Sequence, residues 1–166
     1  IPYVFTDYEK MISSGEIDAV VIATPNDTHY PIGIKALENN LHVLCEKPIA
    51  LTYTEAQHMA DTAREKGVKH LVPFTYRFMP TARYIKELIH DDYIGTPYHL
   101  NMRYYTGFAR DGGYMWRFDT KKAGSGVVGD IGAHFLYVAE WLYGSIKHVS
   151  AELGSHVERP KTDPDG

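Results

Sequence analysis

Residues 41–51 read LHVLCEKPIAL, an apolar run that stops at a glutamate, a lysine and a proline. Its apolar part has the composition of a buried β-strand. Glu46, Lys47 and Pro48 follow at the point where that strand leaves the core. Polar side chains in this position are typical of a site built on a rigid scaffold. A solvated loop lysine beside a turn proline would give the same letters, so the surrounding pattern has to decide.

Two similar apolar runs lie on either side of this one in the sequence. Residues 18–24 read DAVVIAT and residues 68–74 read VKHLVPF. The first is short and rich in β-branched residues, so we expect a strand that is buried on both faces. Helical patterns separate the three runs, and strands that alternate with helices over short connections indicate parallel βαβ units. The sequence therefore predicts an α/β fold for this half of the chain.

Both intervening helices, expected at residues 27–40 and 52–67, carry signals at their ends. The first has two side chains that can cap it and a proline within its first turn. The second begins with a capping box and stops at a glycine. The residues concerned are Asp27, Thr28 and Pro31 in the first helix and Thr52, Glu55 and Gly67 in the second.

The pattern changes after Phe74, and we place a domain boundary near residues 73–76. A helix is expected to open at Pro80, and a glycine-rich stretch leads into another helix. The aromatic, alternating segment YHLNMRYYT has the pattern of an antiparallel sheet with one covered face. These elements are expected at residues 80–90 and 123–144 for the helices, and at 98–106 and 147–157 for two strands.

Composition argues against several classes of protein. The net charge is −4 and there is no basic block, so we expect no nucleic-acid surface. No apolar run reaches the roughly 18 residues of a membrane span, so we expect no membrane segment. Cys45 is the only cysteine, which favours a reducing compartment such as the cytoplasm. The chain begins at Ile1 and ends in a polar tail with two prolines, so we expect a fragment of a longer protein.

The carboxyl ends of parallel strands meet at one edge of a sheet, where ligands bind. Three segments leave the expected strands there: TPNDTHY, EKP and TYRF. If the strands are neighbours, their polar side chains lie along one rim, the usual arrangement of a small-molecule site. The residues of this rim are Thr24, Asn26, His29, Glu46, Lys47 and Arg77.

Asp130 and His134 form a second candidate cluster. Their i, i+4 spacing puts both side chains on one face of an α-helix. A carboxylate beside a histidine can orient the ring and suits a general base. The same spacing is common on solvated helix faces. A zinc site is conceivable because nine histidines are present, but no established spacing matches, and we expect no metal. A cysteine hydrolase would need Cys45, which is more simply a buried strand residue.

Together, these motifs resemble the Gfo/Idh/MocA family of nicotinamide-dependent oxidoreductases. The order and spacing run from about residue 18 to residue 155. The segment VPFTYRFMP resembles the one that joins the two domains of the family, and MWRF followed by AGSGVVGDIGAH resembles its Trp-Arg element and its glycine-rich Asp-x-x-x-His helix. The strand-end motifs are matched by Thr24, Pro25, Asn26 and His29, and by Glu46, Lys47 and Pro48.

The resemblance implies a fold with two domains. Residues 1–74 would be the C-terminal part of a Rossmann dinucleotide-binding domain. Residues 75–166 would begin an α+β domain for substrate binding and oligomerisation, with a large, mostly antiparallel sheet. The Gly-x-Gly-x-x-Gly loop and the acidic residue that reads the ribose are absent, so NAD and NADP both stay open as the cofactor. Thr75 stands where many relatives have asparagine, and Ser125 interrupts the usual triple glycine.

The resemblance also implies hydride transfer between a sugar or polyol, or a related hydroxy compound, and the nicotinamide of NAD or NADP. In that reaction His134 would take the hydroxyl proton, Lys47 would stabilise developing negative charge, and Asp130 would bind substrate and bias the histidine. The Lys47–Pro48 bond would be cis, as it often is in the family. Cofactor contacts are expected from Thr24, Pro25, Asn26, His29, Glu46, Lys47, Pro48 and Arg77.

Aromatic and arginine side chains are candidates for the substrate wall, since aromatic faces pack on sugar C–H groups. Substrate contacts are expected from Lys47, Tyr76, Trp116, Arg117, Asp130 and His134, whereas we expect Tyr104 and Tyr105 to pack in the core. The main alternative is a catalytically inactive dinucleotide sensor of the same fold, although Lys47, Asp130 and His134 are all present. The resemblance further implies a homo-oligomer, either a dimer or a tetramer.

Overall fold

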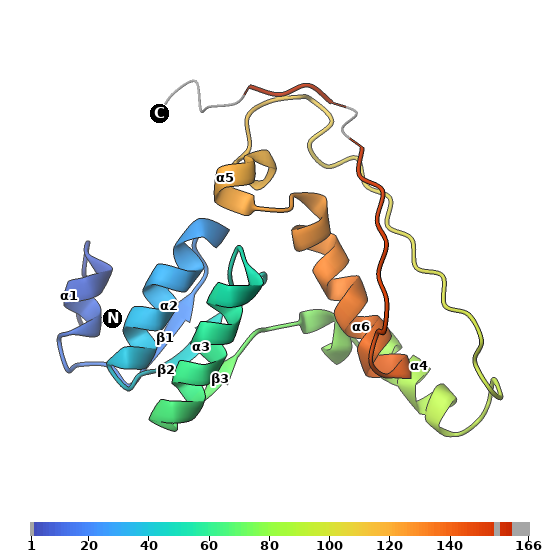
Figure 1. The fold of residues 1–166 in the computed structure, drawn as a ribbon, viewed down its shortest axis with the longest axis horizontal. Helices are drawn as coiled ribbons and strands as arrows, with labels where there is room; N and C mark the ends of the chain where they lie inside the picture. Colours follow the sequence, from blue (N-terminus) through green and yellow to red (C-terminus); the bar gives the residue numbers. More distant parts are fainter. Residues whose placement is uncertain (1, 155–156, 161–166) are drawn as a thin grey trace. The chain divides into compact units, whose positions relative to one another are not determined.

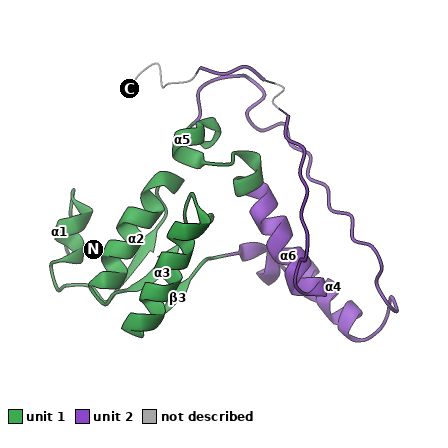
Figure 2. Cartoon of the chain, viewed as in Figure 1, with its two compact units in different colours: residues 1–73, 116–130 green, residues 74–115, 131–166 purple. Residues whose placement is uncertain are grey.

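The computed structural model describes residues 2–154 and 157–160 (Figure 1). The chain divides into two compact units (Figure 2). Unit 1 comprises residues 1–73 and 116–130, and unit 2 comprises residues 74–115 and 131–166. The first change of unit follows Pro73, but the return of residues 116–130 to unit 1 has no local signature in the sequence.

Unit 1 is built on a parallel sheet of three strands, β1 (Ala19–Ile22), β2 (His42–Cys45) and β3 (His70–Leu71). The order is β1-β2-β3 and both pairings are parallel, as predicted. All three strands are shorter than the apolar runs that predicted them. For β3, Pro73 contributes to this, since proline has no N–H to donate to a ladder.

Helices α2 (His29–Glu38) and α3 (Tyr53–Lys66) connect the strands, and the short helix α1 (Tyr8–Ile12) precedes them. The capping box at the start of α3 is confirmed, and Gly67 ends α3 in the left-handed region at φ 66°. The prediction that a side chain caps α2 was wrong. A 3₁₀ turn, η1 (Asn26–Thr28), leads directly into α2 and leaves Thr28 at the cap position without a capping bond. Its hydroxyl donates instead to the Pro25 carbonyl.

The core of unit 1 lies between the sheet and the helices. Val20, Ile22, Val43 and Cys45 point into it and meet apolar residues of the helices. The prediction that β1 is buried on both faces was wrong, because Val21 is 73% exposed. Helices α2 and α3 pack against each other and so lie on the same face of the sheet (Figure 1). On the opposite face, Val21 and Leu71 are 73% and 57% exposed and Leu44 is half-buried.

Residues 116–130 complete unit 1 with three short helical turns. These are η3 (Trp116–Phe118), α5 (Thr120–Ala123) and η4 (Val128–Gly132). The turn η4 is a π-helix, and its last two residues already belong to unit 2.

Unit 2 contains the turn η2 (Thr75–Phe78) and the helices α4 (Pro80–His90) and α6 (Ala133–Tyr143). The helix predicted to open at Pro80 is confirmed. The two predicted strands were wrong for the described residues, in which residues 98–106 and 147–154 have no ladder. An extended segment becomes a strand only when its backbone groups pair with a neighbour. Ser155 and His156, inside the second predicted strand, lie outside the described residues.

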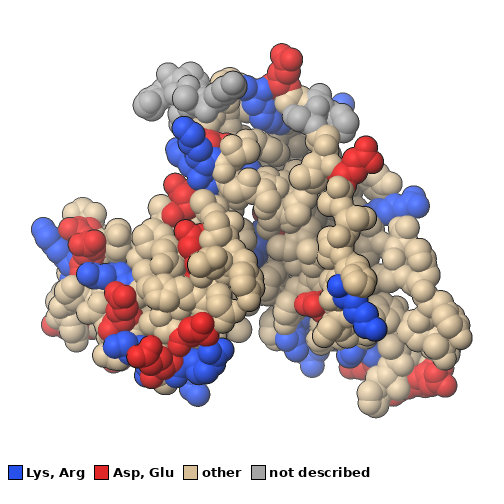
Figure 3. All heavy atoms as spheres, in the orientation of Figure 1, with Lys and Arg blue, Asp and Glu red and all other residues tan. Residues whose placement is uncertain are grey.

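Charged side chains of both signs are interspersed on the face of the molecule in Figure 3. Among the residues that the structure describes, no helix is long and apolar enough to cross a membrane.

Candidate functional site

A cleft of about 130 Å³ lies within unit 1, at the carboxyl ends of β1 and β2. Five of the six residues of the predicted rim line it: Thr24, Asn26, His29, Glu46 and Lys47. The sixth, Arg77, belongs to unit 2. Three further predicted site residues line the same cleft, namely Trp116, Arg117 and Asp130. Ala23, Ala123 and Gly126 also line it and were missed, because small apolar residues carry no chemical signal in a sequence.

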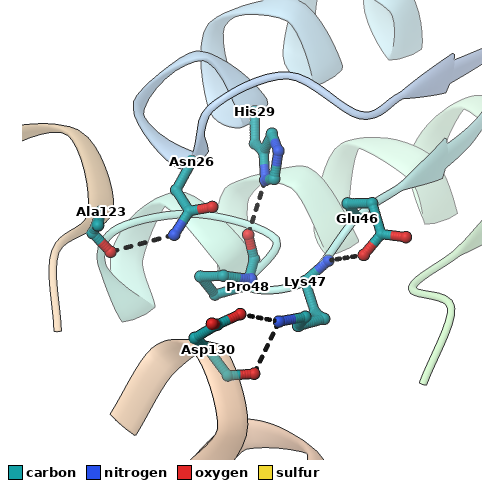
Figure 4. A network of polar contacts seen from close by, with 7 residues as sticks. All are labelled: Asn26, His29, Glu46, Lys47, Pro48, Ala123 and Asp130. Carbon is teal, nitrogen blue, oxygen red and sulfur yellow. Dashed lines mark hydrogen bonds and ion pairs between the residues drawn. The ribbon is translucent and has the colours of Figure 1, made fainter. Parts of the chain in front are cut away.

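Lys47 and Asp130 form the charged centre of this cleft (Figure 4). The Lys47 ammonium lies 2.6 Å from Oδ1 of Asp130 and 2.7 Å from the Asp130 backbone carbonyl. Their side chains are 13% and 35% exposed. Hydrogen bonds between ionised groups are stronger than neutral ones, and partial burial reduces their screening by water. The ammonium is therefore held in a defined place with two acceptors. The Lys47–Pro48 peptide bond is cis, as the resemblance implied.

His29 is a buried cross-link between the two loops that form the cleft. Its ring nitrogens lie 2.8 Å from the carbonyls of Thr24 and Pro48, and the residue is 1% exposed. Carbonyl oxygens only accept, so both contacts are hydrogen bonds at once only when each nitrogen carries a proton. Neither nitrogen is left for a ligand. The contribution of His29 in this structure is to fix the loop that carries Lys47.

Asn26 fixes the segment that closes the cleft. Its side-chain amide donates to the Ala123 carbonyl at 3.1 Å (Figure 4) and is 8% exposed. This bond ties η1 to α5, 97 residues further along the chain. Trp116 and Arg117 precede α5, and the Arg117 guanidinium lies 4.6 Å from the centre of the Trp116 ring. The cleft thus gains an aromatic and cationic wall.

Glu46 supplies a carboxylate to the cleft. The Lys47 backbone amide donates to its Oε2 at 3.2 Å. A carboxylate in this position can accept hydrogen bonds from hydroxyl groups, such as those of a sugar ring. The cleft therefore combines an acceptor, a cation with its counter-ion, and an aromatic wall.

His134 belongs to unit 2, where it lies in the first turn of α6 and is 7% exposed. The Tyr76 ring stacks on its imidazole, with centroids 4.2 Å apart and planes 9° apart. Asp130 lies in the π-helical turn η4 rather than in an α-helix. A π-turn has a wider hydrogen-bonding pattern than an α-helix, so the α-helical spacing argument for Asp130 and His134 does not apply. Their joint action stays a prediction.

Other predicted aromatic and arginine residues lie in unit 2 as well. The Arg77 guanidinium lies over the rings of Phe78, Tyr137 and Trp141, at 5.4–5.8 Å from their centres. Tyr104 is half-exposed and meets Phe135 edge-on. Tyr105 is 85% exposed, so its predicted packing in the core was wrong for the described residues, where the segment that carries it has no paired neighbour.

Two alternative chemistries find no support in the described residues. Burial, with a smaller contribution from the neighbouring Glu46, raises the pKa of the Cys45 thiol to about 12. A nucleophilic cysteine needs a lowered pKa, so a cysteine hydrolase is not supported. Across the described ranges, no group of three or more His, Cys, Asp and Glu side chains is placed to hold a metal ion.

Comparison with known protein families identifies the family of this chain. Residues 1–74 match the family described as an oxidoreductase family with an NAD-binding Rossmann fold, and residues 82–166 match the GFO/IDH/MocA C-terminal domain. The chain belongs to the GFO/IDH/MocA oxidoreductase family. The parallel sheet of unit 1 is accordingly part of a Rossmann NAD-binding fold.

Relatives in this family include sugar dehydrogenases. Levoglucosan dehydrogenase of Pseudarthrobacter phenanthrenivorans is 36% identical over 158 residues, 93% of this chain and 40% of the relative. Glucose-6-phosphate 3-dehydrogenase of Bacillus subtilis is 30% identical over 159 residues, 93% of this chain and 45% of the relative. The chain thus spans less than half the length of these relatives.

A solved structure of levoglucosan dehydrogenase, in complex with NADH and levoglucosan, has the same fold. It is 35% identical to this chain and superimposes with a TM-score of 0.75, covering 84% of this chain and 38% of the other.

The residues of the cleft suit one end of a dinucleotide. Glu46 offers an acceptor for ribose hydroxyls, and the cleft lies at the sheet edge where such ligands bind. Its volume of about 130 Å³ is below the roughly 300–1,000 Å³ of pockets that enclose a drug-sized ligand. It is therefore too small to hold a whole dinucleotide.

Proposed function

We propose that the protein that contains this chain is an NAD(P)-dependent dehydrogenase that oxidises a hydroxyl-bearing carbon of a sugar or polyol. The observation that carries this proposal is the Lys47–Asp130 pair beside Glu46, in a cleft at the carboxyl edge of a Rossmann sheet. A cation held beside a developing alkoxide lowers the cost of its negative charge. The sugar dehydrogenases among its relatives support the same substrate class.

The proposed chemistry divides between three side chains. NAD or NADP, when bound, supplies the nicotinamide ring that accepts the hydride. His134 takes the proton of the substrate hydroxyl, and general-base help of this kind contributes roughly 10²–10⁴-fold. Lys47 stabilises the negative charge on the reacting oxygen. Asp130 holds the Lys47 ammonium in place and accepts a hydrogen bond from substrate.

We propose that the cofactor is bound by the two loops that His29 joins. Glu46 accepts from the nicotinamide ribose, and Thr24 and Asn26 form the opposite wall. Pro25, His29 and Pro48 shape the backbone of these loops. Trp116 and Arg117 form the substrate side, where the ring packs on sugar C–H groups and the guanidinium donates to hydroxyls. For Arg77, which its aromatic neighbours hold, we propose a structural role.

A turnover assay on the full-length protein tests this function. Nicotinamide absorbance is followed with NAD⁺ and NADP⁺ over sugars and polyols that include levoglucosan and glucose 6-phosphate. Lys47→Ala and His134→Ala are expected to abolish most turnover while calorimetry still detects cofactor binding. Lys69→Ala and His90→Ala, at exposed positions, serve as matched controls. Dinucleotide binding without turnover on any substrate would favour the sensor, and the absence of dinucleotide binding would contradict both functions.

We also propose that residues 98–106 and 147–157 join a large antiparallel sheet in the full-length protein. The family's C-terminal domain, which matches residues 82–166, supports this proposal. Following the family resemblance, we propose a homo-oligomer, a dimer or a tetramer, which light scattering after size exclusion would identify. The single cysteine is the basis for proposing that the protein acts in the cytoplasm.

A further inference from the structure

The imidazole of His134 is framed by two aromatic side chains of its own unit. Tyr76 lies parallel to it at 4.2 Å, and Phe74 meets it edge-on, with centroids 5.8 Å apart and planes at 88°. Rotation about the bond that joins an imidazole to its Cβ has only broad preferences, so the torsion alone does not fix the ring plane. A ring stacked at 4.2 Å does fix it, because rotation would drive the imidazole into the Tyr76 face.

The turn that carries Tyr76 is itself held on helix α6. Phe74 stacks on Tyr137 at 4.3 Å with planes 8° apart. The Arg77 guanidinium donates to the Tyr137 hydroxyl and lies 5.5 Å from the centre of the Trp141 ring. His134, Tyr137 and Trp141 are spaced i, i+3, i+7, which places them on one face of α6. The turn η2 therefore meets this face at three successive points.

We propose that Tyr76 is a positioning residue that sets the plane of the His134 imidazole, with Phe74 and Arg77 locking the turn that presents it. The proposal rests on the proposed role of His134 as general base, because a base must be aimed at the proton that it removes. It also gives Tyr76 a different role from the substrate contact predicted from sequence. The Tyr76 face against His134 is occupied, and stacking needs its ring but not its hydroxyl.

Substitutions that separate the ring from the hydroxyl test this inference in the full-length protein. Tyr76→Phe keeps the ring, Tyr76→Leu removes it, and Tyr84→Leu on the exposed surface of α4 is the matched control. The first readout is the NMR signal of the His134 ring protons in protein with isotope-labelled histidine. This signal is identified by its absence from the spectrum of His134→Asn. A ring stacked face to face shields these protons, so we expect them upfield in the parent and in Tyr76→Phe. In Tyr76→Leu we expect this upfield shift to be lost.

Steady-state kinetics supply the second readout. Misplacing a catalytic group by about 1 Å can cost on the order of 10²-fold in rate, so we expect kcat to fall roughly 10- to 100-fold in Tyr76→Leu, with KM nearly unchanged. Tyr76→Phe should retain most of the turnover of the parent protein, and Tyr84→Leu should have the same turnover as the parent. If Tyr76→Leu does not fold, Phe74→Leu replaces it, and a partial loss of the upfield shift with a fall in kcat is expected there.

Three results would overturn the inference. These are an unchanged His134 signal in Tyr76→Leu (or in Phe74→Leu, if that variant replaces it), a fall in kcat in Tyr76→Phe as large as in Tyr76→Leu, and an effect on KM alone. The second would indicate a direct contact with substrate through the hydroxyl, and the third a contribution of Tyr76 to substrate binding alone. A different conclusion would follow if the upfield shift were lost in Tyr76→Leu but His134→Asn kept full turnover. The stacking would stand, and the proposed function of His134 as base would fail.

Discussion

Cys45 illustrates how burial sets the chemistry of one side chain. It ends β2, is 1% exposed and packs in the core of unit 1. Burial disfavours the thiolate, and the negative charge of Glu46 disfavours it further, so the thiol pKa rises to about 12. An acid whose pKa is raised in the folded state stays protonated up to a higher pH there than in the unfolded chain.

We therefore expect a disulfide reagent to react with native Cys45 far more slowly than with the urea-unfolded chain at about pH 8. The unfolded thiol loses its proton near its ordinary pKa of 9.0, well before the folded one. The contribution of this group to the free energy of unfolding is thus complete below about pH 9 and is lost as pH rises towards 12. Equal reaction rates in the native and unfolded states would contradict this.

Gly129 shows close packing at the cleft. A Cβ built at this position would lie 2.6 Å from the Ser125 hydroxyl and 3.8 Å from Pro48. The residue is buried next to Asp130, whose carboxylate and carbonyl both bind Lys47. A methyl group at residue 129 would therefore have to displace the hydroxyl of the exposed Ser125 side chain.

Gly129→Ala should lower the free energy of unfolding by no more than about 1 kcal/mol, the order of one off-rotamer side chain, because the obstructing Ser125 hydroxyl ends an exposed side chain that can rotate away. Ser125→Gly in the same background removes the clashing oxygen and should recover much of that loss. Urea denaturation measures both. Gly113→Ala, whose new Cβ would have no neighbouring atom closer than 3.9 Å, controls for the change from glycine. Equal losses in the single and double variants would show that Ser125 is not the obstacle.

At the scale of elements, helix α3 begins with a capping box that local sequence fully specifies. The Thr52 hydroxyl accepts from the Glu55 amide, and the Glu55 carboxylate accepts from the Thr52 amide. The first amides of a helix have no partner within it, and these two bonds satisfy donors at that end. The helix packs on α2 and contributes Met59 and Ala63 to the core, so its stability affects the whole unit.

Thr52→Ala should therefore lower the free energy of unfolding by about 0.5–2 kcal/mol. Thr54→Ala is a matched control, because Thr54 is exposed within the same helix. Alanine is there the better helix former, so no loss is expected. Thermal or urea unfolding of both variants measures the difference. A similar loss at the two positions would mean that the cap contributes nothing.

At the scale of the whole molecule, the units differ in how their extended segments are paired. In unit 1, residues 42–45 pair with strands on both sides. In unit 2, residues 98–106 have no ladder among the described residues, and Tyr98 is 93% exposed. Unpaired backbone groups exchange their amide hydrogens with solvent much faster than paired ones.

Hydrogen exchange should therefore find slow amides at residues 42–45 and fast amides at residues 98–106 in the 166-residue chain. In the full-length protein, we expect the second segment to become protected as it joins the proposed antiparallel sheet. Mass spectrometry of peptic fragments measures both. Fast exchange of residues 98–106 in both proteins would contradict the sheet.

The sequence by itself determined the alternation of strands and helices in unit 1, the capping box and glycine stop of α3, and the residues at the strand ends. These features are written in short windows, because periodicity, capping and turn preference act over a few neighbouring residues. The same windows overestimated the strands of unit 2, since a strand also needs a partner from elsewhere in the chain.

Only the tertiary structure decided how the site is assembled. Lys47 binds Asp130 across 83 residues and Asn26 binds Ala123 across 97. Only the structure shows that both ring nitrogens of His29 face backbone carbonyls and that the Tyr76 ring stacks on His134. The physical reason is that these contacts form between segments that are distant in the sequence. They depend on how those segments pack and on which polar groups are buried away from water. A local pattern of residues determines neither of these.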